Sequence, residues 1–258
     1  MGRLIFLGTG DPLNDERAQT SLALPQADGT TVLLDTSSGT ILLRQLRAAG
    51  IALGSIRHVF VSHRHFDHAG GLAPLLVALT AVPESEVTIY ALPETLRALH
   101  DLLTATIPGV EDWLGPRLHW QALAAKQAVR LGGLSVTPFL VEHFLETCGF
   151  RLARGRRVAV FTADTQPCPN VVEHARGADL LIHEAYGPDR DAATVHRVGH
   201  STAADAGRAA HEAGVQRLVL THFRSSRFAD PAALVAEAGA VYSGPIEAAT
   251  DLQAVDWP

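Results

Sequence analysis

The sequence contains few of the residues and segments that mark secreted or membrane proteins. Its 258 residues include two cysteines, Cys148 and Cys168, which are too few for a disulfide framework and are typical of a reducing compartment. No apolar run approaches the roughly 18 residues that span a bilayer. The opening apolar run, 4–7, is shorter than the core of a signal peptide. We therefore expect a cytoplasmic protein with no membrane partner.

Positive charge is also scarce. The chain has 21 Lys and Arg residues against 27 Asp and Glu residues, and its formal net charge is -6. Proteins that bind nucleic acid regardless of its sequence need a basic surface, because neutralised phosphates release counterions. That class of protein is therefore disfavoured, although a local pocket can be positive on an acidic protein.

Glycine and proline, 22 and 14 residues, are too few for a low-complexity chain. Apolar residues instead follow short strands and helices, with strands preceding helices in each half. This order favours a mixed α/β (α+β) protein of two sheets packed face to face with helices outside, in a single domain over residues 1–258. Strands are predicted at 4–8, 21–24, 31–35, 56–62, 87–91, 129–131, 134–141, 149–152, 158–162, 179–183, 217–221 and 246–255, and helices at 41–49, 72–81, 93–104, 201–213 and 231–238. The segment 107–117 is predicted to be irregular.

The densest group of polar residues follows the predicted strand 56–62 and reads His63-Arg64-His65-Phe66-Asp67-His68. Imidazole suits zinc and related metals, and a carboxylate adds an anionic ligand. Alternation after a strand lets His63 and His65 point the same way, while Asp67 and His68 reach a second point nearby. One loop can thus supply ligands for two adjacent metals; the alternative is a polar loop with fortuitous histidines.

Further candidate ligands directly follow later apolar runs. His143 comes after the strand 134–141, Asp164 after 158–162 and His222 after 217–221. Each would lie at the rim of a sheet. Taken singly, each has the alternative of a capping or surface residue, but together with the first motif they complete a site for two metals.

These residues, in this order, resemble the metallo-β-lactamase superfamily of binuclear metallohydrolases. The resemblance implies an αββα sandwich, the metallo-β-lactamase fold, with the site at one sheet edge. It implies two divalent metal ions, commonly Zn²⁺, with manganese or iron in some branches. One ion would be bound by His63, His65 and His143, the other by Asp67, His68 and His222, and Asp164 would bridge them.

Four segments are similar to the ribonuclease Z-like branch of that superfamily: Phe6-Leu7-Gly8-Thr9-Gly10, Leu181-Ile182-His183-Glu184-Ala185, His200-Ser201-Thr202 and Leu220-Thr221-His222-Phe223. In that branch the histidine of the His-Ser-Thr triplet assists phosphodiester cleavage, a role that falls here to His200. Glu184 could orient His200, as carboxylates orient imidazoles elsewhere. Asp67 would hold or accept the proton of the nucleophile. Alone, Gly8-Thr9-Gly10 is a tight turn, and no P-loop lysine follows it.

The sequence departs from the tRNA-processing members of the branch, because the bacterial ones typically insert a long, basic, glycine-rich arm between the positions of His143 and Asp164 that grips the tRNA elbow. Only residues 144–163 separate His143 from Asp164, so tRNA is disfavoured as a substrate. The prediction is a phosphodiesterase that cleaves a small or nucleotide phosphodiester by metal-hydroxide attack, with His200 assisting the leaving group. The alternatives are an arylsulfatase, a lactonase or another acyl-ester or thioester hydrolase on the same site, or a non-catalytic metal-binding member. Members of the branch often dimerise, so a homodimer is allowed.

Other segments are weaker candidates for the substrate mouth. Trp113 and Trp120 could line it or belong to the core. The segments 187–199 and 107–117 could each form a lid or a solvated loop. Arg224 and Arg227 could clamp an anionic group, because guanidinium matches phosphate or sulfate, or could lie at the surface.

Overall fold

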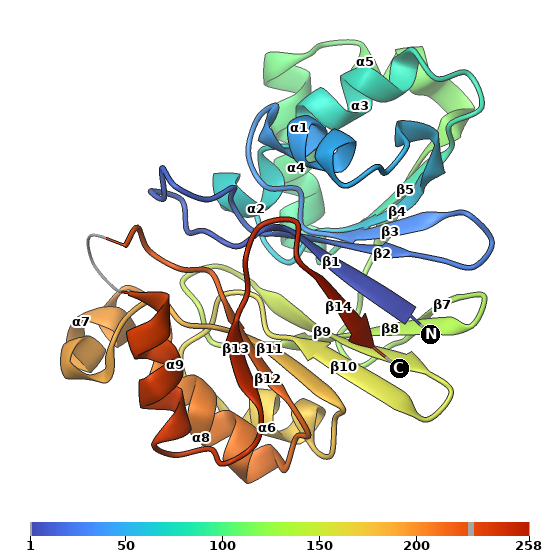
Figure 1. The fold of residues 1–258 in the computed structure, drawn as a ribbon. Helices are drawn as coiled ribbons and strands as arrows, with labels where there is room; N and C mark the ends of the chain where they lie inside the picture. The colour runs from blue at the N-terminus through green and yellow to red at the C-terminus, as the bar shows by residue number, and fades with distance from the viewer. Residues whose placement is uncertain (1, 227–229, 258) are drawn as a thin grey trace.

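The structure is a computed structural model that describes residues 2–226 and 230–257. Its strands form two seven-stranded sheets that face each other, with helices on both outer sides (Figure 1). The strand order is β14-β1-β2-β3-β4-β5-β6 in the first sheet and β13-β12-β11-β10-β9-β8-β7 in the second. The strands are β1 (Gly2–Gly8), β2 (Ser21–Pro25), β3 (Thr31–Leu34), β4 (Ile56–Phe60), β5 (Val87–Ala91), β6 (Leu118–Ala122), β7 (Val129–Leu131), β8 (Leu134–Leu140), β9 (Cys148–Arg154), β10 (Arg157–Phe161), β11 (Leu180–Glu184), β12 (Leu218–Thr221), β13 (Ile246–Ala248) and β14 (Ala254–Trp257).

The helices divide between the two outer faces. Those from the first half of the chain, including α1, α3 and α4, pack on the first sheet, and α6, α8 and α9 pack on the second (Figure 1). This four-layer arrangement confirms the predicted αββα sandwich. The helices are α1 (Ile41–Ala48), α2 (Phe66–Ala69), α3 (Leu72–Thr80), α4 (Pro93–Thr106), α5 (Val110–Leu114), α6 (Pro169–Ala175), α7 (Ala192–Arg197), α8 (Ala203–Ala213) and α9 (Pro231–Gly239), with 3₁₀ turns at Leu53–Ser55, Gly115–Arg117 and Asp189–Asp191.

Alternation along β1 shows how the layers are held together. Leu4 and Phe6 are buried between the two sheets, whereas Ile5 and Leu7 are buried under the helices of the first sheet. Successive side chains of a strand point to opposite faces, so a strand covered on both sides is apolar throughout. The strands therefore form a rigid frame whose ends can carry polar side chains.

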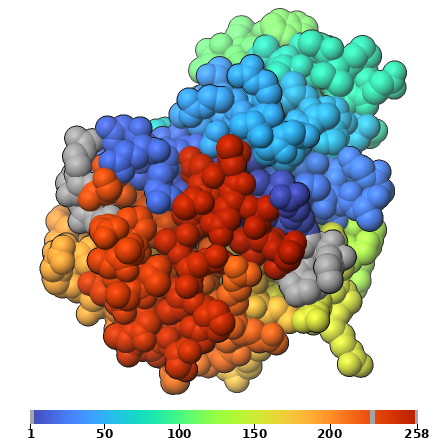
Figure 2. Space-filling view, in the orientation of Figure 1, coloured from blue at the N-terminus to red at the C-terminus, as the bar shows by residue number. Residues whose placement is uncertain are grey.

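The C-terminal prediction of one strand over 246–255 is wrong. The chain first forms β13, which pairs with β12 in the second sheet, and then crosses to β14, which pairs with β1 in the first sheet. A turn at 250–253 separates them, with Leu252 at a φ of 66°. Asp251 stabilises this crossing, because its carboxylate accepts hydrogen bonds from the backbone N–H groups of Thr9 and Ala18. In Figure 2 the C-terminal segment (red) lies over the boundary between the N-terminal half of the chain (blue) and the C-terminal half (orange).

Four other segments are more regular than the sequence indicated. The stretch 107–117 contains α5 and a 3₁₀ turn, because Val110 and Leu114 lie one helical turn apart and are both buried. The pattern also failed to indicate β6, α6 and α7. Among residues 2–226 and 230–257, we find no helix with the length and apolar character needed to cross a membrane.

Candidate binuclear metal centre

The predicted ligands come together at one edge of the two sheets. They follow the ends of strands in both sheets: the 63–68 loop after β4, His143 after β8, Asp164 after β10 and His222 after β12. Three groups form among the described residues, and within each the possible ligand atoms lie within 4.8 Å of one another; Asp164 belongs to all three. Two of them contain the predicted ligands, and we call these the mouth cluster (His63, His65, His143, Asp164) and the deep cluster (Asp67, His68, Asp164, His222). The third joins Asp164 to Glu184 and His200.

The mouth cluster is assembled from three imidazoles. His65 Nδ1 lies 3.0 Å from His63 Nε2 and 3.3 Å from His143 Nε2. Asp164 Oδ2 is 3.6 Å from His63 Nε2. His143 Nδ1 donates a hydrogen bond to the carbonyl of Gly199 at 2.7 Å, so its Nε2 keeps a lone pair that faces the cluster. His65 and His143 are half-buried, and this cluster is therefore the one that opens to solvent.

The deep cluster combines two carboxylates with two imidazoles, all buried. His68 Nε2 is 3.3 Å from Asp67 Oδ2 and 3.1 Å from Asp164 Oδ1, and His222 Nε2 is 3.5 Å from Asp164 Oδ2. Four atoms facing the centre make no hydrogen bond: Asp67 Oδ2, His68 Nε2, Asp164 Oδ1 and His222 Nε2. A buried polar atom without a partner costs about 1–3 kcal/mol, so four that converge fit a bound cation.

The electrostatics of the two clusters also suit cations. Burial lowers the pKa of His63 well below its usual value and that of His222 to about 4, so both imidazoles are neutral near pH 7 and have a lone pair for a metal. Burial would lower the pKa of His68 as well, but the carboxylates of Asp164, Asp67 and Asp35 outweigh it and raise that pKa well above its usual value. The deep cluster thus concentrates negative charge that requires a proton or a metal ion.

Asp35, at the end of β3, is a buried residue that the sequence analysis missed. Its carboxylate accepts hydrogen bonds from the Ser62 backbone N–H at 2.7 Å, the Ser62 hydroxyl at 2.9 Å and His68 Nδ1 at 2.7 Å. It therefore fixes the tautomer of His68 and turns Nε2 toward the deep cluster. Its φ of 58° is a strained value for a residue other than glycine, and His222 has a similar φ of 57°. An aspartate that directly follows an apolar strand was the available signal.

His200 and Glu184 lie beside both clusters, as the sequence analysis proposed. His200 Nδ1 is 3.0 and 3.2 Å from the two carboxylate oxygens of Glu184, and the His200 ring centroid is 5.2 Å from that of His143 and 5.3 Å from that of His222. Burial raises the pKa of Glu184 to about 6. Burial would lower the pKa of His200, but the Glu184 carboxylate outweighs it and raises that pKa to about 9. The pair can therefore hold a proton close to the metal site.

The helix that follows His200 begins at the predicted capping box. Thr202 accepts a hydrogen bond from the Asp205 backbone N–H, and the Asp205 carboxylate accepts one from the Thr202 backbone N–H. Asp205 also lies 2.7 Å from His196 Nε2, in α7. The segment 187–199 is thus partly helical and tied to the start of α8.

The mouth of the site has an apolar rim and a cationic neighbour. Phe66 and Phe144 directly follow His65 and His143, and they are 59% and 63% exposed. Arg224 lies over the ring of Tyr186, with its guanidinium carbon 5.1 Å from the ring centroid, whereas Arg227 falls outside the described residues.

The predicted tryptophans lie elsewhere. Trp120, on β6 at the edge of the first sheet, lies against His100 with ring centroids 4.0 Å apart and ring planes tilted by 39°. Trp113 is exposed on α5. A cavity of about 560 Å³ lies between α6 and α8 and is lined by His183 and Asp205, among others. His183 precedes Glu184 on β11, so their side chains point to opposite faces of the sheet and the cavity is separate from the metal site.

Comparison with known proteins agrees with this geometry. The family model described as "Beta-lactamase superfamily domain" matches residues 30–223, which is more than half of the chain. The sequence is 33% identical to Ribonuclease Z of Thermobifida fusca, over 99% of this chain and 94% of that protein. It is 29% identical to Ribonuclease Z of Myxococcus xanthus, over 99% of this chain and 98% of that protein.

The alignment with the Thermobifida protein is 304 positions long and this chain has 258 residues, so at least 46 positions of that relative have no counterpart here. Between His143 and Asp164 this chain has only the hairpin of β9 and β10. The chain is thus shorter than these relatives.

Solved structures share the fold. The metallo-beta-lactamase fold protein YhfI of Bacillus subtilis has a TM-score of 0.86 at 23% identity, over 99% of this chain and 100% of that one. The short form of human tRNase Z has a TM-score of 0.79 at 22% identity, over 99% of each chain. From the family match and the identity to ribonuclease Z proteins, the chain belongs to the beta-lactamase superfamily, in its ribonuclease Z-like branch of metal-dependent hydrolases.

Proposed function

We propose that this protein is a binuclear phosphodiesterase that cleaves a small or nucleotide phosphodiester. The observation that carries the proposal is the position of Asp164, whose carboxylate belongs to both clusters and lies within 3.6 Å of His63, His68 and His222. A shared carboxylate holds two cations at the short separation that phosphoryl transfer uses, roughly 3.5–4 Å. Zinc is the expected metal because imidazole supplies most of the ligands, with manganese and iron as the other candidates.

The chain's own residues divide the work of the reaction. His63, His65 and His143 would hold one cation, Asp67, His68 and His222 the other, and Asp164 both. When bound, the two cations supply Lewis acidity that stabilises charge on the phosphoryl oxygens and makes hydroxide available near neutral pH. Asp67 would orient the attacking oxygen and accept its proton.

His200 would supply the proton that the leaving alkoxide needs. Its Nδ1 is held by Glu184, which leaves Nε2 as the nitrogen that can donate to a departing oxygen. A positioned acid of this kind typically contributes about 10²–10⁴-fold to the rate. Arg224, beyond Tyr186, adds positive charge on the same side and favours an anionic substrate.

The shape of the chain favours a small substrate. The connection from His143 to Asp164 is a tight hairpin that carries Arg151, Arg154, Arg156 and Arg157 but no long insertion that could extend along a folded RNA, and the net charge of the chain is -6. The exposed rings of Phe66 and Phe144 beside the mouth cluster suit a nucleobase or an aryl group.

The test is an activity panel on protein depleted of metal and then reconstituted with zinc, manganese or iron. The panel contains bis(p-nitrophenyl) phosphate, cyclic nucleotides, a precursor tRNA, an aryl sulfate, a lactone and a thioester. We expect metal-dependent hydrolysis of the small phosphodiesters. Preferential cleavage of the aryl sulfate or of an acyl substrate would contradict the proposal, as would full activity after metal removal.

A further inference from the structure

The ring of Tyr186 lies flat against the ring of His200. The two centroids are 4.2 Å apart and the planes differ by 5°, which is closer and more nearly parallel than the contacts of His200 with the rings of His143 and His222. Tyr186 follows Glu184 by two residues at the end of β11. One short segment, 184–186, therefore supplies both contacts of the imidazole: Glu184 at its edge and Tyr186 against its face.

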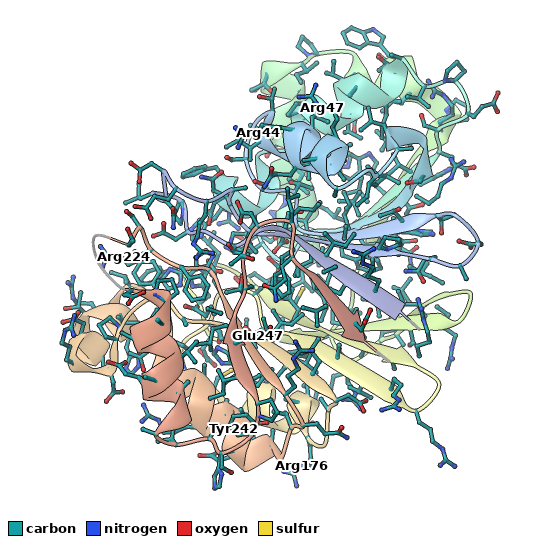
Figure 3. The ribbon with its side chains drawn as sticks, in the orientation of Figure 1. Arg44, Arg47, Arg176, Arg224, Tyr242 and Glu247 are labelled. Carbon is teal, nitrogen blue, oxygen red and sulfur yellow. The ribbon has the colours of Figure 1, made fainter. Side chains whose placement is uncertain are left out.

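Backbone hydrogen bonds hold the segment of Tyr186 beside the segment of His200. The Tyr186 N–H donates a hydrogen bond to the carbonyl of Ser201 at 3.0 Å, and Ser201 N–H donates to the Glu184 carboxylate at 3.1 Å. The segments that carry Tyr186 and His200 are thus bonded to each other directly. Tyr186 is half-buried, and Arg224 packs over its ring. Arg224 is labelled in Figure 3, in the loop after β12.

His200 is held covalently at Cβ and by Glu184 at Nδ1, and these two restraints still allow the ring plane to tilt and so to move Nε2. A ring stacked on the face of the imidazole restricts that tilt. Tyr186, at 4.2 Å, lies nearer to His200 than the rings of His143 and His222, at 5.2 and 5.3 Å. Aromatic contacts of this kind contribute about 0.5–1.5 kcal/mol beyond the area that they bury.

We propose that Tyr186 is a positioning residue for His200, which keeps Nε2 aimed at the leaving oxygen while Glu184 holds Nδ1. The inference rests on the proposed function, because it assumes that His200 assists the leaving group. It deepens that function by assigning the leaving-group side of the site to the stack of Arg224, Tyr186 and His200.

The experiment compares Tyr186→Leu with Tyr186→Phe in the metal-reconstituted protein. The leucine variant removes the stacked ring, and the phenylalanine variant keeps the ring and removes only the hydroxyl. The substrates are aryl phosphodiesters that differ in leaving group, from p-nitrophenyl, which departs readily, to phenyl, which needs a proton. Metal content is measured for each variant.

We expect Tyr186→Leu to lower kcat by about tenfold or more on the phenyl diester and by less than about threefold on the p-nitrophenyl diester, because only the poor leaving group depends on the acid. Tyr186→Phe should match the wild type within about twofold, since the ring is kept. In a His200→Ala background, Tyr186→Leu should have no further effect. Equal losses on both diesters, or an equal loss in the His200→Ala background, would overturn the proposal.

A second measurement does not depend on activity. In protein labelled at histidine, the His200 ring resonance is identified by its absence from His200→Ala. It should be a single sharp signal in the wild type and Tyr186→Phe, and broadened or doubled in Tyr186→Leu. A sharp single signal in Tyr186→Leu would overturn the positioning role. Absence of phosphodiesterase activity in the wild type, with this NMR difference present, would instead refute the proposed function alone.

Discussion

The deep and mouth clusters use similar ligands but are held in different ways. The deep cluster is buried throughout, and a buried carboxylate, Asp35, holds its His68. In the mouth cluster, His143 is half-buried and held by the backbone carbonyl of Gly199. Charge-assisted hydrogen bonds are roughly twice as strong as neutral ones. The deep cluster is therefore the rigid base of the site, and the mouth cluster is the side that solvent and substrate reach.

The residue that the two clusters share gives the largest expected effect. Asp164→Ala removes the only carboxylate common to both groups, so we expect both cations to bind poorly and phosphodiesterase activity to fall to background. The measurement is metal content by plasma mass spectrometry together with kcat/KM. If this variant retained the metal of the deep cluster at wild-type affinity, the two clusters would be independent rather than bridged.

Removal of the acid should separate chemistry from metal binding. His200→Ala should lower kcat by about 10²–10⁴-fold, because the leaving alkoxide loses its proton donor. Metal content should stay at the wild-type value, since the mouth and deep clusters keep all of their ligands and His200 belongs only to the third group, with Asp164 and Glu184. Loss of metal in parallel with loss of activity would make His200 a ligand or a structural residue.

A matched pair of substitutions tests the contrast in how the clusters are held. Asp35→Asn removes the charge that orients His68, and we expect it to weaken metal binding in the deep cluster by about 10–100-fold. Gly199→Ala perturbs a ligand of the mouth cluster and none of the deep cluster, although the added Cβ also contacts Phe144 and Gly199 precedes His200. A Cβ at position 199 would lie 2.9 Å from His143 Nδ1, and the φ of 79° is strained for alanine.

Metal titration followed by calorimetry distinguishes the two variants. Asp35→Asn should weaken one binding event and Gly199→Ala the other, with a smaller loss for Gly199→Ala because His143 can shift toward solvent. Identical changes in both events for either variant would show that the clusters respond as one unit.

A fall in pH should weaken the hydrogen bonds of Asp205, which hold the segment beside the mouth cluster. Asp205 joins α7 to α8 through His196 and Thr202, and so holds the segment that ends at Gly199. Burial alone would raise the pKa of Asp205, but its hydrogen bonds to His196, Arg208 and Thr202 outweigh it and lower the pKa from 3.8 to about 2. Because the folded-state pKa is the lower one, this carboxylate stabilises the fold by about 2 kcal/mol above pH 4.

This stabilisation should be lost as the pH falls from about 4 to about 2. Urea unfolding of the metal-free protein at several pH values measures it. Asp205→Asn should be less stable than the wild type at pH 7 and should approach it at pH 2. An unchanged difference between the two proteins over this range would contradict the assignment.

Site residues that are contiguous in the sequence, or that directly follow an apolar strand, could be predicted from the sequence. Residues that act only through a contact formed in the folded chain could not. The loop from His63 to His68 carries four ligands in one motif, and the strand ends before His143, Asp164 and His222 could be recognised from apolar runs. Asp35 and Tyr186 could not be assigned roles, because each acts on a histidine that is distant in sequence and the contact exists only in the folded chain. The prediction of one strand over 246–255 was wrong for a related reason. The residues are strand-like throughout, and their composition does not indicate that the chain crosses from one sheet to the other.

The smallest expected effect concerns the rim of the mouth cluster. The ring of Phe144 is 5.7 Å from that of His143, and it stands 63% exposed where a substrate group would enter. Phe144→Ala should raise KM for aryl and nucleotide diesters by about 3–10-fold, the equivalent of a lost aromatic contact of about 0.5–1.5 kcal/mol. Dimethyl phosphate, which has no ring to stack, provides the control, and its slow hydrolysis should be unchanged. A comparable change in kcat for both substrates would mean that Phe144 supports His143 rather than the substrate.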